Sequence, residues 1–161
     1  MPTPLTPHFT LEELTKVGSH VGMVNDPPQS VAGNLLAVAE KLEQARAIWN
    51  CPVLVSYGYR SPALNDACGG SPTSAHMDGL AADAVPTDMT LREGFDALVA
   101  DPTFMADVDQ LIIERGCVHV GLPTEAHAWT PRHELRLEQD VAGVRTYPLY
   151  GYWTISGVSR V

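Results

Sequence analysis

Prolines and glycines interrupt this chain so often that it has little room for long regular elements. The 161 residues include 13 Pro and 13 Gly, spread along the whole length rather than gathered in one segment. Proline cannot donate a backbone hydrogen bond, and glycine favours turns. The spacing therefore predicts short helices and strands with many turns, in one α+β domain covering residues 1–161. A chain of this length has little room for a second full core.

Three segments have the sequence pattern of a helix. The longest covers residues 30–49, with Ser30 as the expected N-cap, and its apolar residues recur at three- and four-residue spacing: Val31, Leu35, Val38, Leu42, Ala45 and Trp49. The other two helices, expected to end near residues 18 and 98, start at capping boxes in which a Glu follows three residues after a Thr: Thr10 with Glu13, and Thr90 with Glu93.

Short apolar and β-branched segments predict the strands. Six segments qualify by composition and by the turn residues around them: residues 53–57, 80–85, 110–113, 117–120, 135–137 and 152–155. The third and fourth are separated only by Glu114, Arg115 and Gly116, a spacing typical of a hairpin with a glycine in its turn. We therefore expect a small antiparallel sheet packed with helices.

The charge of the chain argues against several kinds of partner. Nineteen Asp and Glu residues against ten Lys and Arg residues give a formal net charge of −9, and no segment gathers the basic residues. Proteins that bind nucleic acid through its phosphates need clustered cations. No apolar stretch is long enough to cross a bilayer. The sequence thus predicts neither a nucleic-acid partner nor a membrane span.

The N-terminus and the cysteines point to synthesis in the cytoplasm. The first ten residues, MPTPLTPHFT, contain neither a basic start nor an apolar segment, so no secretory signal is visible. Three cysteines are an odd number, and they lack the CxxC spacing of metal-binding or redox pairs. We expect reduced, mostly buried thiols at Cys51, Cys68 and Cys117.

The residues best suited to chemistry are two histidines and an aspartate. His76 lies in a loop, and Asp83 follows on a predicted strand, with Gly79 between them to let the chain turn. His119 lies on another strand, where alternation puts it on the same face as Gly121 and so beside open space. Two imidazoles and one carboxylate are a ligand set of catalytic zinc sites, which keep a fourth position for water. Each residue alone is more often an ordinary loop or core residue.

Three ordered motifs connect this pattern to a known family. They are, in chain order, residues 56–65 (SYGYRSPALN) with Gly69-Gly70-Ser71, residues 74–83 (SAHMDGLAAD), and residues 110–120 (QLIIERGCVHV). Over roughly residues 9–122 the chain resembles the zinc D-Ala-D-Ala carboxypeptidases of metallopeptidase family fifteen, which are related to phage endolysins and to the Hedgehog fold. The resemblance implies one zinc ion per chain, bound by His76, Asp83 and His119. Residues 123–161 lie beyond it as a C-terminal extension of unknown role.

The resemblance also implies roles for residues near the metal. Arg60 would bind a substrate carboxylate or carbonyl, and Ser74 would bond to the substrate or support a ligand. Many relatives have the catalytic acid three residues before the second metal-binding His, but this chain has Gly116 there. Glu114 is the nearest acid and the expected general base. On one continuous strand it would face away from that His, so the intervening turn must change the direction.

Other residues offer alternatives. Asp109 and Asp78 are weaker candidates for the base. Cys117 shares a strand face with the second metal-binding His, but as a fourth ligand it would close the site to water. The pair His133 and Glu134 begins like an HExxH zinc motif but has no second His, so a helical zinc site is rejected.

The sequence as a whole predicts a zinc peptidase that acts on bacterial cell walls. Its substrate would be the peptide part of peptidoglycan, cleaved by a monomer acting as a D-Ala-D-Ala carboxypeptidase or as an endopeptidase of the endolysin type. Without a secretory signal, a wall enzyme would need holin-type release or delivery by a virion, which suggests a phage protein. Two other functions stay open: a non-catalytic zinc-containing module of a phage particle, and a cytoplasmic D-Ala-D-Ala dipeptidase.

Overall fold

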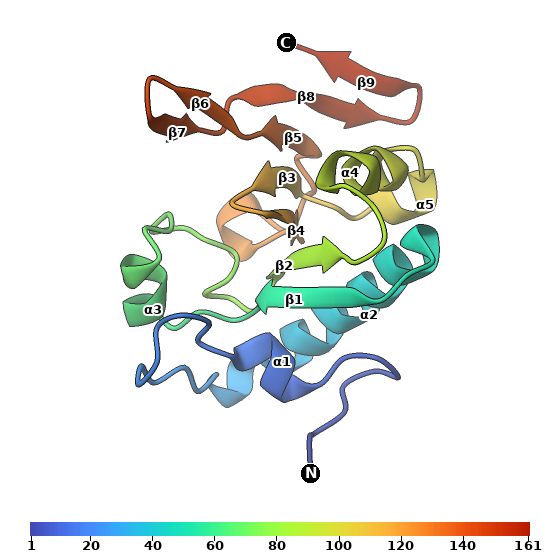
Figure 1. Ribbon diagram of the computed structural model, residues 1–161. Coiled ribbons are helices and arrows are strands. Elements are labelled where there is room, and N and C mark those ends of the chain that lie inside the picture. The colour runs from blue at the N-terminus through green and yellow to red at the C-terminus, as the bar shows by residue number, and fades with distance from the viewer.

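One mixed sheet of seven strands runs through the molecule (Figure 1). The computed structural model describes all residues from 1 to 161. The strand order is β1-β2-β4-β3-β5-β8-β9, with the bounds β1 Val53–Tyr57, β2 Ala81–Pro86, β3 Gln110–Glu114, β4 Cys117–Gly121, β5 Glu134–Leu137, β8 Leu149–Thr154 and β9 Gly157–Arg160. A separate two-stranded sheet pairs β6 (Gln139–Val141) with β7 (Val144–Thr146).

All neighbouring strands but one pair are antiparallel, as the sequence predicts. β3 and β5 run parallel, with Gln110 opposite Glu134 and Ile113 opposite Leu137. Residues 122–133 carry the chain from the end of β4 back to the far edge of β3, so β5 enters in the same direction as β3. Parallel neighbours need such a crossover, whereas a hairpin can only pair antiparallel strands. The prediction of an antiparallel sheet is therefore wrong for this pair, while the single-domain α+β class is confirmed.

The helices are short, apart from α2 (Ala32–Trp49). The others are α1 Leu11–Thr15, α3 Pro62–Ala67, α4 Leu91–Val99 and α5 Pro102–Met105, with 3-10 turns η1 Gln29–Val31 and η2 Glu125–His127. Both predicted capping boxes form, at Thr10 and Thr90. The prediction of Ser30 as the N-cap is wrong, because Ser30 lies inside η1. α2 begins after Val31, which makes no side-chain capping hydrogen bond. None of these helices is long and apolar enough to cross a membrane.

Strand alternation divides the two central strands between the core and a polar face. Ala82 and Ala84 on β2, and Val118 and Val120 on β4, belong to a core cluster of 26 buried residues that also contains much of α2. α2 packs against β2, and α4 packs against β3 and β4. The intervening residues of both strands point to the opposite face of the sheet. The alternation of side chains along β2 and β4 therefore provides core residues on one face of the sheet and polar residues on the other.

The C-terminal extension continues the sheet. β5 pairs with β3, β8 with β5, and β9 with β8, so residues 123–161 are built onto the edge of the preceding strands. The predicted strand at 135–137 lies in β5, and the one at 152–155 overlaps β8, which starts and ends earlier. β6, β7 and β9 are not predicted, because they are short and mostly exposed and leave no alternating apolar pattern to detect.

A carboxylate joins the extension to the rest of the sheet. Glu134 on β5 is 9% exposed and accepts a hydrogen bond of 2.7 Å from the Nε2 of Gln110 on β3. The guanidinium groups of Arg132 and Arg136 lie 3.5 and 3.3 Å from its carboxylate oxygens. Burial raises the pKa of Glu134, but these three partners outweigh it and hold the pKa below its usual value. Folding therefore favours the ionised form of the Glu134 carboxylate.

We expect Glu134→Gln to destabilise the protein by about 1–3 kcal/mol at neutral pH, the range for losing a hydrogen bond to a charged group. Because folding lowers the pKa of Glu134, its contribution is present above about pH 4.3, the unfolded value, and is lost as the pH falls through the folded value. Urea unfolding of both proteins across this range is the measurement. The stability difference should shrink in acid, and an equal difference in acid and at neutral pH would contradict the assignment.

Candidate metal centre

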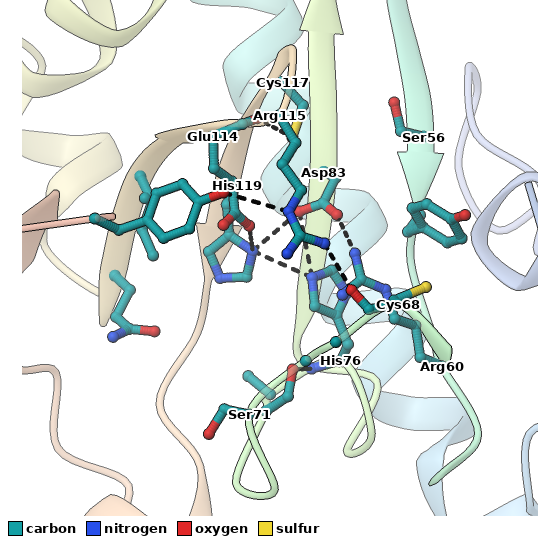
Figure 2. Close-up of a pocket in the computed structure, with 18 of the residues that line it drawn as sticks. Ser56, Arg60, Cys68, Ser71, His76, Asp83, Glu114, Arg115, Cys117 and His119 are labelled. Atoms are coloured by element: carbon teal, nitrogen blue, oxygen red, sulfur yellow. Dashed lines mark hydrogen bonds and ion pairs between the residues drawn. The ribbon is translucent and has the colours of Figure 1, made fainter. Parts of the chain in front are cut away.

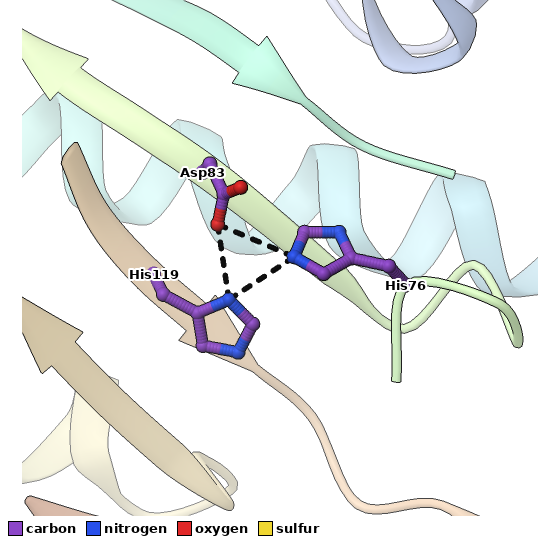
Figure 3. Close-up of side chains that lie close together, drawn as sticks. All are labelled: His76, Asp83 and His119. Atoms are coloured by element: carbon purple, nitrogen blue, oxygen red, sulfur yellow. Dashed lines mark hydrogen bonds and ion pairs between the residues drawn. The ribbon is translucent and has the colours of Figure 1, made fainter. Parts of the chain in front are cut away.

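Three side chains from separate segments meet on the polar face of the sheet (Figure 3). His76 comes from the loop before β2, Asp83 from β2, and His119 from β4. Asp83 and His119 are direct partners in the β2–β4 register, so strand pairing itself brings them together. The Nε2 of His76 and the Nδ1 of His119 lie 3.2 and 3.0 Å from Oδ1 of Asp83, and 3.2 Å from each other.

The spacing of these three atoms fits a metal ion. Zinc bonds N and O ligands at about 2.0–2.1 Å in a tetrahedron, which separates two ligand atoms by roughly 3.3 Å. The three residues are buried, with exposed fractions of 1%, 3% and 6% for His76, Asp83 and His119. Imidazole nitrogens and carboxylate oxygens are donors for divalent metals, so the cluster could hold such an ion. Three donors leave one vertex of a tetrahedron for another group.

Two of the ligands are held by a further contact. The Nδ1 of His76 donates to the carbonyl oxygen of Gly58 at 2.6 Å. Because the proton is then on Nδ1, the lone pair of Nε2 faces the metal position. The second oxygen of Asp83, Oδ2, accepts a hydrogen bond from Arg60. These contacts orient both donors before any ion binds.

Two glycines allow close packing at the cluster and beside it. Gly121 leaves the open space expected beside His119: an added Cβ would lie 3.2 Å from the Nε2 of that ring. At Gly58, an added Cβ would lie 2.8 Å from the Cα of Leu14 and closer still to its carbonyl oxygen. That oxygen accepts the backbone N–H of Tyr59 at 2.7 Å. α1 is thus packed directly against the segment that orients the first ligand.

We expect Gly58→Ala to destabilise the protein by about 1–3 kcal/mol, because backbone atoms must shift to admit the Cβ. The matched control is Gly33→Ala on α2, where an added Cβ meets nothing within 4 Å and helix propensity favours alanine by up to about 1 kcal/mol. Thermal unfolding should therefore move in opposite directions for the two variants. An unchanged melting temperature for Gly58→Ala would refute the close approach.

Burial and mutual contact set the charges of the ligands. Burial would raise the pKa of Asp83, but His76 and His119 outweigh it and hold the pKa well below its usual value. Burial lowers the pKa of His76. Burial also acts to lower the pKa of His119, but the hydrogen bond to Asp83 and the charge of that carboxylate leave it raised. An anionic carboxylate and a neutral imidazole are the forms that bind metals.

Arg60 forms an ion pair with Asp83, one of the three residues of the cluster. Its Nη2 donates to Oδ2 of Asp83, and its guanidinium lies over the ring of Tyr57, 4.5 Å from the ring centroid. Its Nε is buried without a hydrogen-bond partner. The sequence predicts a substrate contact for Arg60 but not the ion pair with Asp83. Nothing in the spacing signals that pair, because the two residues come together only when β1 and β2 have paired.

Glu114 lies on the same face as the ligands. It pairs with Cys117 across the β3–β4 hairpin, and alternation puts Cys117 and His119 on one side of β4. The chain reverses at Arg115 and Gly116, whose φ angles of 44° and 82° suit a two-residue type I′ turn. This turn makes the change of direction that the sequence requires. Oε1 of Glu114 lies 3.8 Å from the Nδ1 of His119, and the side chain is 21% exposed.

The two weaker candidates for the base are placed less well. Asp109 is buried in an ion pair with Arg132, which donates to it from the backbone N–H at 2.8 Å and from Nη2 at 2.6 Å. Two further bonds from the Nε of Arg132 reach both carboxylate oxygens, so the group is fully engaged. Asp78 is exposed and does not line the cleft around the ligands.

Ser74 and Cys117 both line that cleft. The Oγ of Ser74 accepts the backbone N–H of His76 at 3.4 Å, so Ser74 supports the loop that carries the first ligand. The Sγ of Cys117 donates to the carbonyl oxygen of Glu114 at 2.9 Å, and burial raises the pKa of its thiol. All three cysteines are unpaired, and Cys51 and Cys117 are buried, as predicted.

The ligands lie in a cleft of about 710 Å³ (Figure 2). The β3–β4 hairpin, the segment from Ala67 to His76 and the connection after β4 contribute to its walls. Sequence reasoning missed several of the polar residues that line it: His20, Arg115, His127, Arg132 and Tyr147. Arg115 lies within the third motif but has no role in it, and the other four belong to no motif, so only the three-dimensional arrangement reveals them.

Comparison with known families supports this geometry. The family model described as Peptidase M15 matches residues 7–120, more than half of the chain, and the match includes His76, Asp83 and His119. A search of curated proteins found no match. Peptidase M15 is a family of metallopeptidases, for which zinc is the typical metal. This chain therefore belongs to the Peptidase M15 family.

Proposed function

We propose that this protein is a zinc peptidase that hydrolyses peptide bonds in peptidoglycan stem peptides or cross-links, with D-Ala-D-Ala carboxypeptidase or endolysin-like endopeptidase activity. The observation that carries the proposal is the buried cluster of His76, Asp83 and His119 at the floor of a polar cleft, with the carboxylate of Glu114 beside it. Membership of the Peptidase M15 family supports a peptide substrate.

The residues around the cluster suit amide hydrolysis. Zinc, when bound, would polarise the scissile carbonyl and lower the pKa of a water molecule. Glu114 is partly exposed and accepts no hydrogen bond from a side chain, so it can take a proton from the attacking water and pass it to the leaving amine. Arg60 holds Oδ2 of Asp83 and so keeps Oδ1 directed at the metal position. Ser74 steadies the loop of His76 and can bond to the substrate.

Incubation of the zinc-loaded protein with purified muropeptides, and with free D-Ala-D-Ala, tests the proposal. Mass spectrometry of the products should show loss of a terminal D-Ala or cleavage of a cross-link, and the metal-free protein should show neither. Cleavage of the free dipeptide alone would indicate a dipeptidase instead. No cleavage of any substrate by protein with a full zinc complement would favour a non-catalytic binding module.

A further inference from the structure

Arg115 bridges the two walls of the cleft. It lies in the turn between β3 and β4, and its Nη1 donates to the carbonyl oxygen of Cys68, in the opposite wall, at 2.6 Å. Its Nε donates to the hydroxyl of Tyr147, from the C-terminal extension, at 3.3 Å. Figure 2 shows the guanidinium extending from the hairpin toward Cys68, in front of the metal ligands in that view. Three segments far apart in the sequence therefore meet at this side chain.

The guanidinium of Arg115 forms no close ion pair with a carboxylate. Three arginines line the cleft: Arg60 pairs with Asp83, and Arg132 pairs with Asp109. The guanidinium of Arg115 has no carboxylate oxygen within 4.0 Å, and both of its hydrogen bonds go to neutral oxygens. Arg115 is exposed and lines the cleft, so its unused N–H donors are open to an anion that enters from solvent.

The geometry of the side chain suits a carboxylate in particular. A guanidinium carries five N–H donors, and the contacts to Cys68 and Tyr147 use two of them. The remaining donors, on Nη1 and Nη2, can bind both oxygens of a carboxylate. The two protein contacts hold the group in place, so little side-chain entropy remains to be lost on binding. A backbone hydrogen bond from the N–H of Arg115 to Glu138 steadies the turn as well.

We propose that Arg115 receives the free C-terminal carboxylate of the substrate and thereby selects peptides cleaved close to their C-terminus. This inference rests on the proposed function. Arg115, Glu114 and the three residues of the cluster line the same cleft, so a peptide held there by its terminal carboxylate would have its last peptide bonds near the catalytic groups. Hydrolysis adds one water across the C–N bond: the acyl carbon gains the hydroxyl, and the amine gains the proton. The released fragment carries the carboxylate that Arg115 holds.

The test compares acetylated D-Ala-D-Ala with its C-terminal amide, which differ only in the group offered to Arg115. The zinc-loaded protein should hydrolyse the acid with a kcat/KM roughly 10- to 100-fold above that for the amide, the size of a charge-assisted carboxylate contact. Arg115→Ala should lower kcat/KM for the acid and bring the ratio close to one. Arg115→Lys, which keeps the charge without the planar fork, should give an intermediate ratio.

Controls separate this specificity from a structural role. Arg92→Ala removes an exposed arginine on α4 that pairs with Asp96 and does not line the cleft, and its ratio should equal that of the unchanged protein. Tyr147→Phe removes one contact of Arg115 and should keep most of the preference. If Arg115→Ala slows both substrates equally, or if the unchanged protein hydrolyses acid and amide equally well, the assignment of Arg115 is wrong, although the proposed function stands.

Binding measurements decide the case in which neither compound is hydrolysed. That result would count against the proposed carboxypeptidase activity, and calorimetry would then compare binding of the acid and the amide to the zinc-loaded protein. Tighter binding of the acid, lost in Arg115→Ala, would support the carboxylate site on its own. Equal binding of both compounds to both proteins would overturn it.

Discussion

Replacement of His119 by alanine should reduce the zinc content from about one ion per chain to almost none. The cluster has three donors, and two donors alone should not hold the ion at micromolar concentrations. The loss of several kcal/mol of carbonyl and water activation corresponds to a fall of about 10³-fold or more in kcat/KM. Metal analysis after dialysis, followed by the muropeptide assay, measures both effects. His76→Ala and Asp83→Ala should behave in the same way.

The matched control is His127→Ala. His127 also lines the cleft but lies outside the three-residue cluster, so its replacement should leave the zinc content unchanged. Circular dichroism of each variant establishes that metal loss is not caused by unfolding. A folded His119→Ala protein that still carried one zinc ion per chain would show that the cluster is not the metal site.

Replacement of Glu114 by glutamine should lower kcat by about 10²- to 10⁴-fold, the usual contribution of a positioned general base, while zinc content stays at about one per chain. The amide keeps the size of the side chain but cannot accept a proton at neutral pH. Because Oε1 lies 3.8 Å from the Nδ1 of His119 rather than among the cluster's closest contacts, the change should spare the metal. Metal analysis and the pH profile of kcat/KM together separate loss of a base from loss of the ion.

Glu125→Gln, a change at an exposed acid on η2, serves as the control and should keep full activity. If Glu114→Gln retained the activity of the unchanged protein, another group would have to move the proton. Asp109 is poorly suited to that task, because four hydrogen bonds from Arg132 occupy its carboxylate. Such a result would therefore remove the only well-placed base from the proposed mechanism.

Local patterns predict much of this fold because local forces decide those parts. The capping boxes at Thr10 and Thr90 satisfy helix N-termini within three residues, and the β3–β4 hairpin is closed by its own two-residue turn. The parallel pairing of β3 with β5 depends instead on the path of residues 122–133 through space. No short-range pattern encodes that path, so the sequence could not predict it.

The same distinction applies to the site. The three residues of the cluster occur in recognisable motifs on or beside strands, and the β2–β4 register then brings Asp83 opposite His119. The acidic partners of the arginines could not be predicted in this way, because Arg60 with Asp83 and Arg132 with Asp109 are each 23 positions apart in the sequence. An arginine on a loop has many possible acidic partners in an acidic protein, and only the packed structure selects one.

The alternation along β2 and β4 makes correct strand pairing and metal binding a single event. A slip of one residue between these strands would turn either Asp83 or His119 toward α2 and expose the small aliphatic side chains of that strand, which now fill the interior. Burying an unpaired charge there is prohibitively unfavourable, so misaligned chains should be both metal-free and unstable. A bound ion would therefore indicate that β2 and β4 are correctly paired. The fraction of molecules that retain the ion would then measure how much of a purified sample is correctly folded.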